Sequence, residues 1–393
     1  MKVLQVIPSV SAVYGGPSRA IADIERALTA RGIEVTTATT NDEGDTRTLP
    51  LPCGVPVQTT CATRWYFPRS TVFFSVSVGL GRWLKNNIEA FDIVHAHALF
   101  SFAPVVAAFL ARRANVPYIL RPLGVLAPYG MTRRHPFLKK ISFALIERRL
   151  IEAASAVHFT SSAEQADAEA LGLKCKGVVI PLGIDINGVA RSGVLRRKPS
   201  DTRNLLFLSR IDPKKNLEGV LRALPLVLAK KLDVTLSIAG SGDPQYIKSL
   251  QSLTRDLAID NHVNWLGYVE GERKSDILAT ACAFVLPSYS ENFGIAVVEA
   301  LAAGLPCLVS REVAISGEID KAGAGIVVST APREIAAGIE NILGNERGIT
   351  EMSVAARALA SSAFSMDAMG ARLEGLYRDI LSSQQAGGVA HVS

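Results

Sequence analysis

The sequence predicts an α/β protein made of two doubly wound domains, each a parallel sheet with helices on both faces. Short apolar runs alternate with helical stretches through most of the 393 residues, which is the pattern of a parallel sheet wrapped by helices. One polar segment with Gly and Pro, residues 184–203, interrupts this alternation and is expected to be a linker. The length also suggests two domains, because a domain typically contains about 150 residues.

The first half of the chain is expected to form an N-terminal domain, residues 1–183. The apolar run at 2–8 predicts a first strand, a helix follows at about 18–31, and a second strand is expected at 34–39. Four more short apolar runs predict strands, namely DIVHAH (92–97), PYILR (117–121), AVHFT (156–160) and GVVIP (177–181).

The alternation restarts after the linker and predicts a second domain at 204–363. Its expected strands are NLLFLS (204–209), VTLSIAG (234–240), VNWLG (263–267), AFVLP (283–287), PCLVS (306–310) and GIVVS (325–329). A helix is expected at 216–230, and two more helical patterns follow at about 349–362 and 367–382.

Composition excludes several classes of protein. The chain is 48% hydrophobic with a mean hydropathy of +0.24, which supplies two buried cores and argues against disorder. Aromatic residues make up only 6%, too few for the stacking platforms of single-strand nucleic-acid binding, so no nucleic-acid partner is expected. The net charge is +6, and an equal excess lies within 121–150 alone.

Five cysteines, at 53, 61, 175, 282 and 307, form no Cys-x-x-Cys pair and indicate a reduced chain. The N-terminus lacks a signal-peptide pattern, and the longest apolar region is too short and interrupted to span a bilayer. A cytoplasmic location is therefore expected.

Ligands of doubly wound domains bind beyond the carboxyl ends of the strands, so the strand-to-helix loops are the place to search. Gly15 and Gly16 follow the first strand and precede a helix. They let an anion approach free backbone N–H groups, or they form an ordinary turn. Gly240 and Gly242 of AGSGD likewise either admit a nucleotide near the backbone or serve as turn glycines.

The loop RIDPKKN places two cations at the end of one strand. Arg210 follows the strand and Lys215 stands at the start of the next helix. A guanidinium and an ammonium that converge on a helix N-terminus form a phosphate clamp. The alternative is a solvated basic loop.

The stretch SENFGIAVVEALAAGLP carries two acids, Glu291 before a helix and Glu299 on its second turn. Eight residues at about 100° each return to within about 80° of one face, so both acids can face one ligand. Backbone N–H groups between them point toward an anion at the helix start; they belong to Asn292, Phe293 and Gly294. Alternatively, Glu291 complements the helix dipole and Glu299 is a surface residue, although its apolar neighbours indicate that this carboxylate has a partner.

His95 and His97 lie two residues apart near the end of a strand and therefore face the same side. No third metal ligand lies nearby in sequence, so metal binding is not expected. His97, at the strand end, is the candidate for a ligand cleft; the alternative is a core histidine.

In this order the motifs DIVHAH, PLGID, SRIDPKKN, AGSGD and SENFGIAVVEALAAGLP resemble those of family 4 retaining glycosyltransferases of the GT-B fold, over nearly the whole chain. The form RPLGVLAP after the strand at 117–121 resembles the exopolysaccharide or O-antigen branch. This resemblance implies two Rossmann-like domains facing each other across a cleft, with a C-terminal helix, 364–383, returning to the N-terminal domain. It also implies a nucleotide-sugar donor (GDP- or UDP-sugar) and a glycan or lipid-linked saccharide acceptor in surface polysaccharide synthesis.

Residue roles follow from the same resemblance. Arg210 and Lys215 would bind the donor diphosphate, and Glu299 would bind the ribose. Glu291 would contact the sugar, with the backbone at 292–294 helping to hold sugar and phosphate. His97 would lie beside the anomeric carbon and Gly16 near the phosphates.

The absence of Asp-x-Asp predicts a metal-independent reaction without a cofactor. A related nucleotide-sugar epimerase and a non-catalytic nucleotide-sugar binder remain open alternatives. A Rossmann oxidoreductase would need a Gly-x-Gly-x-x-Gly fingerprint, which the first loop lacks.

The basic segment has two interpretations. Residues 131–150 are either a scaffold helix packed on its sheet with solvated lysines, or an acceptor-side surface facing an anionic membrane, with the protein held peripherally on the inner face. Leu138, Ile141 and Leu145 share one helical face in either case. The residues assigned to the acceptor or membrane are Arg121, Arg133, Arg134, Lys139 and Lys140.

Overall fold

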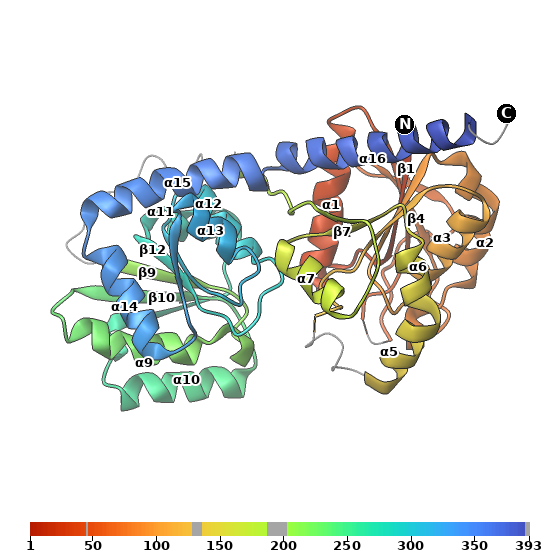
Figure 1. The fold of residues 1–393 in the computed structure, drawn as a ribbon. Coiled ribbons are helices and arrows are strands. Elements are labelled where there is room, and N and C mark those ends of the chain that lie inside the picture. Colours follow the sequence, from red (N-terminus) through yellow and green to blue (C-terminus); the bar gives the residue numbers. More distant parts are fainter. Residues whose placement is uncertain (45, 128–135, 187–202, 390–393) are drawn as a thin grey trace. The chain divides into compact units, whose positions relative to one another are not determined.

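The computed structural model describes residues 1–44, 46–127, 136–186 and 203–389 (Figure 1). The chain divides into two compact units. Unit 1 comprises Met1–Gly183 together with the chain from Met366 onward, and unit 2 comprises Ile184–Ser365. The sequence predicted that the N-terminal domain ends at residue 183 and that the returning C-terminal helix begins at residue 364. Most of the expected linker, residues 187–202, lies outside the described residues.

Unit 1 contains an eight-stranded sheet in the order β3-β4-β2-β1-β5-β6-β7-β8. Every neighbouring pair is parallel except β3 with β4. Its strands are β1 (Lys2–Ser9), β2 (Glu34–Thr40), β3 (Pro56–Gln58), β4 (Thr63–Phe67), β5 (Ile93–His97), β6 (Tyr118–Arg121), β7 (Ala156–Phe159) and β8 (Gly177–Val179).

One apolar cluster of unit 1 lies on one face of this sheet. Leu4, Val94 and Ala96 point to that face and pack with small residues of α3, such as Ala107. The helices are α1 (Gly16–Thr29), α2 (Val78–Asn87), α3 (Phe102–Arg113), α5 (Pro136–Ser142), α6 (Arg148–Glu152), α7 (Ser162–Ala170) and α16 (Met366–Val389). Single turns are η1 (Ala12–Tyr14), η2 (Phe73–Ser75), η3 (Ile88–Ala90) and η4 (Phe143–Glu147). Helix α1 buries Ile21, Ile24 and Leu28 as well.

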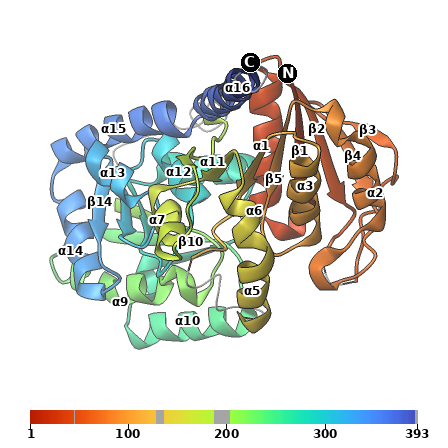
Figure 2. The ribbon, with the colours of Figure 1, turned by 45° about the vertical axis from the view of Figure 1, so that its right-hand side comes forward.

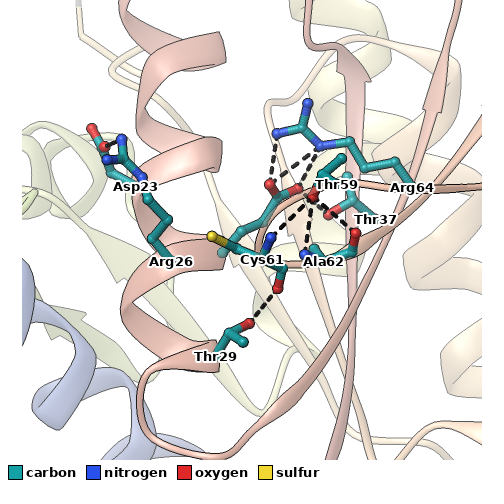
Figure 3. Close-up of polar contacts among 9 residues, drawn as sticks. Asp23, Arg26, Thr29, Thr37, Thr59, Cys61, Ala62 and Arg64 are labelled. Atoms are coloured by element: carbon teal, nitrogen blue, oxygen red, sulfur yellow. Dashed lines mark hydrogen bonds and ion pairs between the residues drawn. The ribbon is translucent and has the colours of Figure 1, made fainter.

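A buried carboxylate fixes α1 to the sheet. Glu25 of α1 accepts hydrogen bonds from Thr37 Oγ1 on β2 at 2.6 Å and from the Arg64 guanidinium on β4 at 2.6 Å, and Figure 3 shows both side chains turned toward α1. Thr29, at the end of the helix, donates to the carbonyl of Cys61 at 2.5 Å. These bonds fasten the C-terminal half of α1 to the sheet and to the segment before β4.

The C-terminal helix α16 packs on α1 (Figures 1 and 2). Met369, Leu373 and Tyr377 are fully buried at a spacing of four residues, so one stripe of α16 faces unit 1. Arg31, just beyond α1, binds Glu374 at 2.5 Å and Asp367 at 2.8 Å. The last helix thus belongs to the N-terminal unit.

Unit 2 contains a six-stranded, all-parallel sheet in the order β11-β10-β9-β12-β13-β14. Its strands are β9 (Arg203–Leu208), β10 (Val234–Ala239), β11 (Val263–Gly267), β12 (Ala283–Leu286), β13 (Cys307–Ser310) and β14 (Gly325–Val328). Figure 2 shows α9, α10 and α14 on one side of unit 2 and α12, α13 and α15 on the other.

The helices of unit 2 complete the doubly wound pattern. They are α9 (Leu217–Leu228), α10 (Pro244–Asp256), α11 (Gly271–Thr280), α12 (Ile295–Ala302), α13 (Ser316–Ala322), α14 (Pro332–Leu343) and α15 (Glu346–Phe364), with single turns η5 (Pro213–Lys215) and η6 (Asp260–His262). Helix α12 is apolar nearly all round and is buried, as its sequence IAVVEALA requires.

Candidate active site

Both sheets reverse their strand order at a switch point. In unit 2 the order moves outward from β9 to β10 on one side and to β12 on the other, and in unit 1 from β1 to β2 and to β5. Ligands of open α/β sheets bind at such points, outside the carboxyl ends of the two strands. The loops after β9 and β12, and those after β1 and β5, therefore form the candidate sites.

The loops after β9 and β12 are joined by their backbones and by an ion pair. The amide of Tyr289 donates to the carbonyl of Lys214 at 2.8 Å. Lys215 Nζ binds Glu291 Oε2, and the side chains of this pair are only 8% and 18% exposed. The structure therefore brings together two of the predicted donor-site residues, which are 76 positions apart in the sequence.

Arg210 is exposed at the end of β9 and forms no hydrogen bond or ion pair within the described part of the chain. Lys214 is half-buried beside Lys215. Burial, and next the charge of Lys215, lower the pKa of Lys214. This end of β9 thus presents three cations close together in the loop where the phosphate clamp was predicted.

Gly240 and Gly242 are needed for backbone packing. A Cβ on Gly240 would lie 1.8 Å from the carbonyl oxygen of Ser209, and one on Gly242 would lie 2.0 Å from that of Ile211. Ile211 donates its amide to Ser241 at 2.8 Å, which fastens the loop after β10 to the loop after β9. These glycines let two loops meet; their contact with a nucleotide stays a prediction.

The start of α12 has the backbone features that favour an anion. Gly294 caps the helix with φ +81°, a left-handed conformation that glycine adopts without strain. Phe293 is buried and packs edge-on against Phe364 at 5.8 Å, which anchors the loop. Within the described ranges, no acceptor is found for the amides of Phe293 and Gly294. Their N–H groups and the helix dipole favour a negative ligand there.

Glu299 is a buried acid with a partner. It is 4% exposed, which excludes the surface interpretation, and it accepts a hydrogen bond from Lys274 Nζ of α11 at 2.8 Å. The prediction that this carboxylate is paired is confirmed. Its role in binding ribose stays a prediction.

In unit 1, Gly15 and Gly16 are exposed at the start of the 14-residue helix α1. Gly15 has φ +66°, and no atom lies within 4 Å of the position of an added Cβ. The loop therefore offers open backbone at a helix N-terminus, as an anion site requires.

His97 ends β5 and is fully buried. Its Nε2 lies 2.5 Å from Gln5 Oε1, whereas its Nδ1 has no hydrogen-bond partner among the described residues. Burial lowers the pKa of His97 far below its usual value, and the positive charge of Arg121 lowers it further. His97 is therefore a neutral imidazole in the folded state.

The structure corrects the assignment of Arg121. This residue is 2% exposed at the end of β6, where it pairs in register with His97, so it cannot face a membrane. Burial lowers the pKa of Arg121 to about 10, and it stays charged at neutral pH. The charge count over residues 121–150 grouped Arg121 with surface cations, although Arg121 lies at the end of a strand.

The rest of the basic segment divides in two. Arg133 and Arg134 lie outside the described residues. Lys140 is exposed on α5, and Lys139 lies 5.7 Å from the centroid of the Phe100 ring. Of the two interpretations of this segment, the one in which the face of Leu138, Ile141 and Leu145 packs on the sheet does not hold. All three are exposed, and Phe143, Leu150 and Ile151 form the buried face instead.

Among the described residues, no group of three His, Cys, Asp or Glu side chains is arranged to hold a metal ion. No helix formed by those residues is both long and apolar enough to cross a bilayer.

Comparison with known proteins identifies the family. Residues 196–359 match the family model "Glycosyl transferases group 1", and residues 15–183 match the "Glycosyl transferase 4-like domain". The chain belongs to the group 1 glycosyltransferases. As a glycosyltransferase of this type it is expected to use a nucleotide-sugar donor, and the two matched regions correspond to the two units.

Named relatives of this glycosyltransferase differ in their substrates. It is 30% identical to the phosphatidyl-myo-inositol mannosyltransferase of Mycolicibacterium smegmatis over 56% of this chain and 53% of the relative. It is 27% identical to the glycogen synthase of Mycobacterium tuberculosis over 70% of this chain and 65% of the relative. The match thus spans about half of the first enzyme's length and less than two thirds of the second's.

Solved structures show that the glycosyltransferase has the GT-B fold. Sucrose-phosphate synthase from Thermosynechococcus elongatus superposes with a TM-score of 0.73 at 18% identity, covering 98% of this chain and all of that one. Anabaena HepE in complex with UDP-glucose superposes with a TM-score of 0.70 at 20% identity, with coverages of 98% and 100%. The predicted fold class is confirmed.

Sequence reasoning missed the partners of its candidate residues. Nothing local to Glu299 indicates Lys274, which lies on the preceding helix. Gln5 and Tyr377, which surround the histidines, were also missed. Polar residues inside short strands, such as Gln5 in KVLQVIP, were a usable signal, because strands buried on both faces are normally apolar throughout.

Proposed function

We propose that this glycosyltransferase moves a hexosyl unit from a UDP- or GDP-sugar to a glycan or lipid-linked saccharide, with retention of anomeric configuration and without a metal ion. The observation that carries the proposal is the pairing of Lys215 with Glu291 at the start of α12, with Glu299 on the second turn of that helix. Cation, free amides and acids stand together at the switch point of unit 2.

The chemistry follows from these groups. As the bond to the sugar breaks, negative charge grows on the departing diphosphate, and fixed cations and N–H dipoles stabilise it. Lys215 can leave Glu291 for a phosphate oxygen, and Arg210 is exposed on the same loop. The released Glu291 carboxylate then accepts hydrogen bonds from sugar hydroxyls. Glu299, presented by the same helix, accepts them from ribose.

Metal independence is part of this proposal. Lys215 and Arg210 supply the positive charge that a divalent cation would otherwise supply to the leaving group. We expect turnover to be the same in EDTA and in added Mg²⁺. Loss of activity in EDTA that Mg²⁺ restores would contradict this part of the proposal.

The experiment is a donor and acceptor screen. The enzyme is incubated with UDP- and GDP-hexoses, and nucleotide release, sugar products and glycosides are measured, with the anomeric configuration read by NMR. Release of nucleotide with a new α-glycoside from an α-linked donor supports the proposal. Sugar interconversion without a glycoside indicates an epimerase, and binding without turnover indicates a non-catalytic binder.

We also propose that unit 1 meets the acceptor at an anionic membrane, on the cytoplasmic side. None of the five cysteines, all of which lie in the described ranges, forms a disulfide, in agreement with a reducing compartment. Helix α5 and the turn η4 expose a run of large apolar side chains beside Lys140; Phe137 is 73% and Leu145 59% exposed, and Leu138, Ile141 and Ile146 are exposed as well. Apolar side chains flanked by cations match the interior and the head groups of an anionic bilayer.

Vesicle co-sedimentation tests the membrane proposal. Wild type is expected to sediment with anionic vesicles at low salt, and Phe137→Ser/Leu145→Ser to bind at least about tenfold more weakly, because each apolar side chain contributes about 1.5–3 kcal/mol on burial. The control is Leu226→Ser/Val354→Ser, which removes two exposed apolar side chains from unit 2. Equal sedimentation of both variants would contradict the proposal.

A further inference from the structure

A row of buried polar side chains crosses one face of the sheet in unit 1. Val94 and Ala96 of β5 point into the apolar core, so His95 and His97 point to the opposite face. Gln5 of β1 and His158 of β7 lie on that face too, and Tyr377 of α16 reaches it from the C-terminal helix. Buried polar groups are costly unless hydrogen-bonded, so this row demands an explanation.

The row is one continuous chain of hydrogen bonds. His97 Nε2 lies 2.5 Å from Gln5 Oε1, and Gln5 Nε2 lies 3.3 Å from Tyr377 Oη. Tyr377 Oη lies 2.8 Å from His95 Nδ1, and His95 Nε2 lies 3.3 Å from His158 Nδ1. This series of hydrogen bonds ends at the carbonyl of Ile180, whose oxygen lies 2.8 Å from His158 Nε2.

The protonation of the three histidines fixes the direction of this chain. Burial lowers the pKa of each of them, that of His158 to about 3, so each is neutral and carries a single N–H. A carbonyl only accepts, so His158 Nε2 donates to Ile180 and its Nδ1 accepts from His95 Nε2. His95 Nδ1 then accepts from the Tyr377 hydroxyl.

The remaining links follow in the same way. Because the Tyr377 hydroxyl donates its hydrogen bond to His95, its oxygen accepts a hydrogen bond from the side-chain amide N–H of Gln5. Gln5 Oε1 therefore faces His97 and accepts from its Nε2–H. The lone pair of His97 is left on Nδ1, the buried atom without a partner in the described ranges. A flipped Gln5 would leave donors or acceptors of the row unpaired, which disfavours it by about 10- to 100-fold.

We propose that Tyr377 and Gln5 are positioning residues that hold His97 as the Nε2–H tautomer, so that Nδ1 accepts a hydrogen bond from a hydroxyl of the transferred sugar. The inference rests on the proposed function and on the expectation that His97, at the end of β5, lies beside the transferred sugar. It gives the C-terminal helix a part in the reaction, because one link of the chain is supplied by α16.

The test removes one hydroxyl. Tyr377→Phe keeps the ring but deprives Gln5 of its acceptor and His95 of its donor, so Gln5 can rotate and both tautomers of His97 become populated. The control is Tyr118→Phe, a buried tyrosine of the same unit whose hydroxyl donates to the carbonyl of Leu150 at 2.7 Å, outside the row. Gln5→Met, a near-isostere, removes the hydrogen bond that His97 Nε2 makes with Gln5.

Two readouts are measured. In ¹⁵N-histidine-labelled protein, the imidazole shifts of His97 are expected to report Nε2–H alone in wild type and Tyr118→Phe, and a mixture in Tyr377→Phe and Gln5→Met. In the transfer assay, kcat is expected to fall about 10- to 100-fold in Tyr377→Phe with the donor KM changed less than about threefold.

The two readouts separate the two proposals. If no donor is turned over, the proposed function fails, while the ¹⁵N spectra still test the tautomer. Wild-type protein with Nδ1–H on His97, or a tautomer unchanged in both variants, would overturn the inference. So would a loss of kcat in Tyr377→Phe no larger than that in Tyr118→Phe.

Discussion

Unit 1 should lose most of its stability between pH 7 and pH 5. His95, His97 and His158 are fully buried, and burial holds the pKa of each well below 6.5. The unfolded chain takes up a proton on each at a pKa of about 6.5, whereas the folded chain does not. Stability is therefore complete above about pH 6.5 and falls as the pH drops below it.

The magnitude can be worked out from these three groups. At pH 5, protonation of one exposed histidine favours the unfolded chain by about 2 kcal/mol, and three give about 6 kcal/mol. Carboxylates of the unfolded chain take up few protons in this window, because the pKa of an exposed Asp or Glu lies near 4. A loss of about 6 kcal/mol is comparable to the whole stability of a typical domain, about 5–15 kcal/mol.

Urea unfolding of the full chain, followed by fluorescence from unit 1 only, measures this loss. The chain has three tryptophans, and Trp265→Phe leaves Trp65 and Trp83, both in unit 1, as the only fluorescent probes of that kind. For an m-value of about 2–3 kcal/mol/M, the midpoint should fall by about 2–3 M between pH 7 and pH 5.

A matched variant checks that the histidines are responsible. In His158→Asn, unfolding should take up two protons in place of three. The slope of unfolding free energy against pH should therefore be smaller by about 1.4 kcal/mol per pH unit. A midpoint that is constant from pH 7 to pH 5, or an unchanged slope in His158→Asn, would refute the reasoning.

Three further predictions concern unit 2. Lys215→Ala should lower kcat about 10²–10³-fold, because it removes a fixed cation from the leaving group, whereas Lys230→Ala, which removes an exposed lysine, should not; a smaller loss would leave Lys215 outside the reaction. Glu299→Ala should weaken UDP or GDP binding at least about tenfold by calorimetry, while Glu351→Ala, at a 68% exposed glutamate, should bind normally. Gly240→Ala should destabilise unit 2 by about 3 kcal/mol or more in thermal unfolding, since its Cβ would lie 1.8 Å from a carbonyl oxygen; a wild-type melting temperature would contradict this.

The fold could be predicted because its signals are local. Strand and helix patterns and the break at 184–203 are read within windows of a few residues, and they predicted most of the parallel strands of both sheets. The short edge strand β3 and its neighbour β4 were missed. The sequence of β3, PVQ, is only three residues long, whereas the aromatic residues of β4, TRWYF, were a usable strand signal.

The site could be predicted only in part, because its partners are distant in sequence. The loops that carry Lys215 and Glu291 were found from strand ends, but their ion pair joins residues 76 apart. Tyr377 meets His95 across 282 residues, through a helix that no local pattern connects to β5. Arg121 was misplaced because a charge count over thirty residues takes no account of which side chains a sheet buries.

Nucleotide binding by titration calorimetry tests the central claim most directly, namely that the loops after β9 and β12 hold a nucleoside diphosphate. Wild type, Glu299→Ala, Lys215→Ala and the control Lys230→Ala are titrated with UDP and GDP in EDTA. The account predicts that wild type and Lys230→Ala bind at least one of the two nucleotides, and that both site variants bind it at least about tenfold more weakly. Equal affinity in all four proteins, or binding that needs a divalent metal, would contradict it.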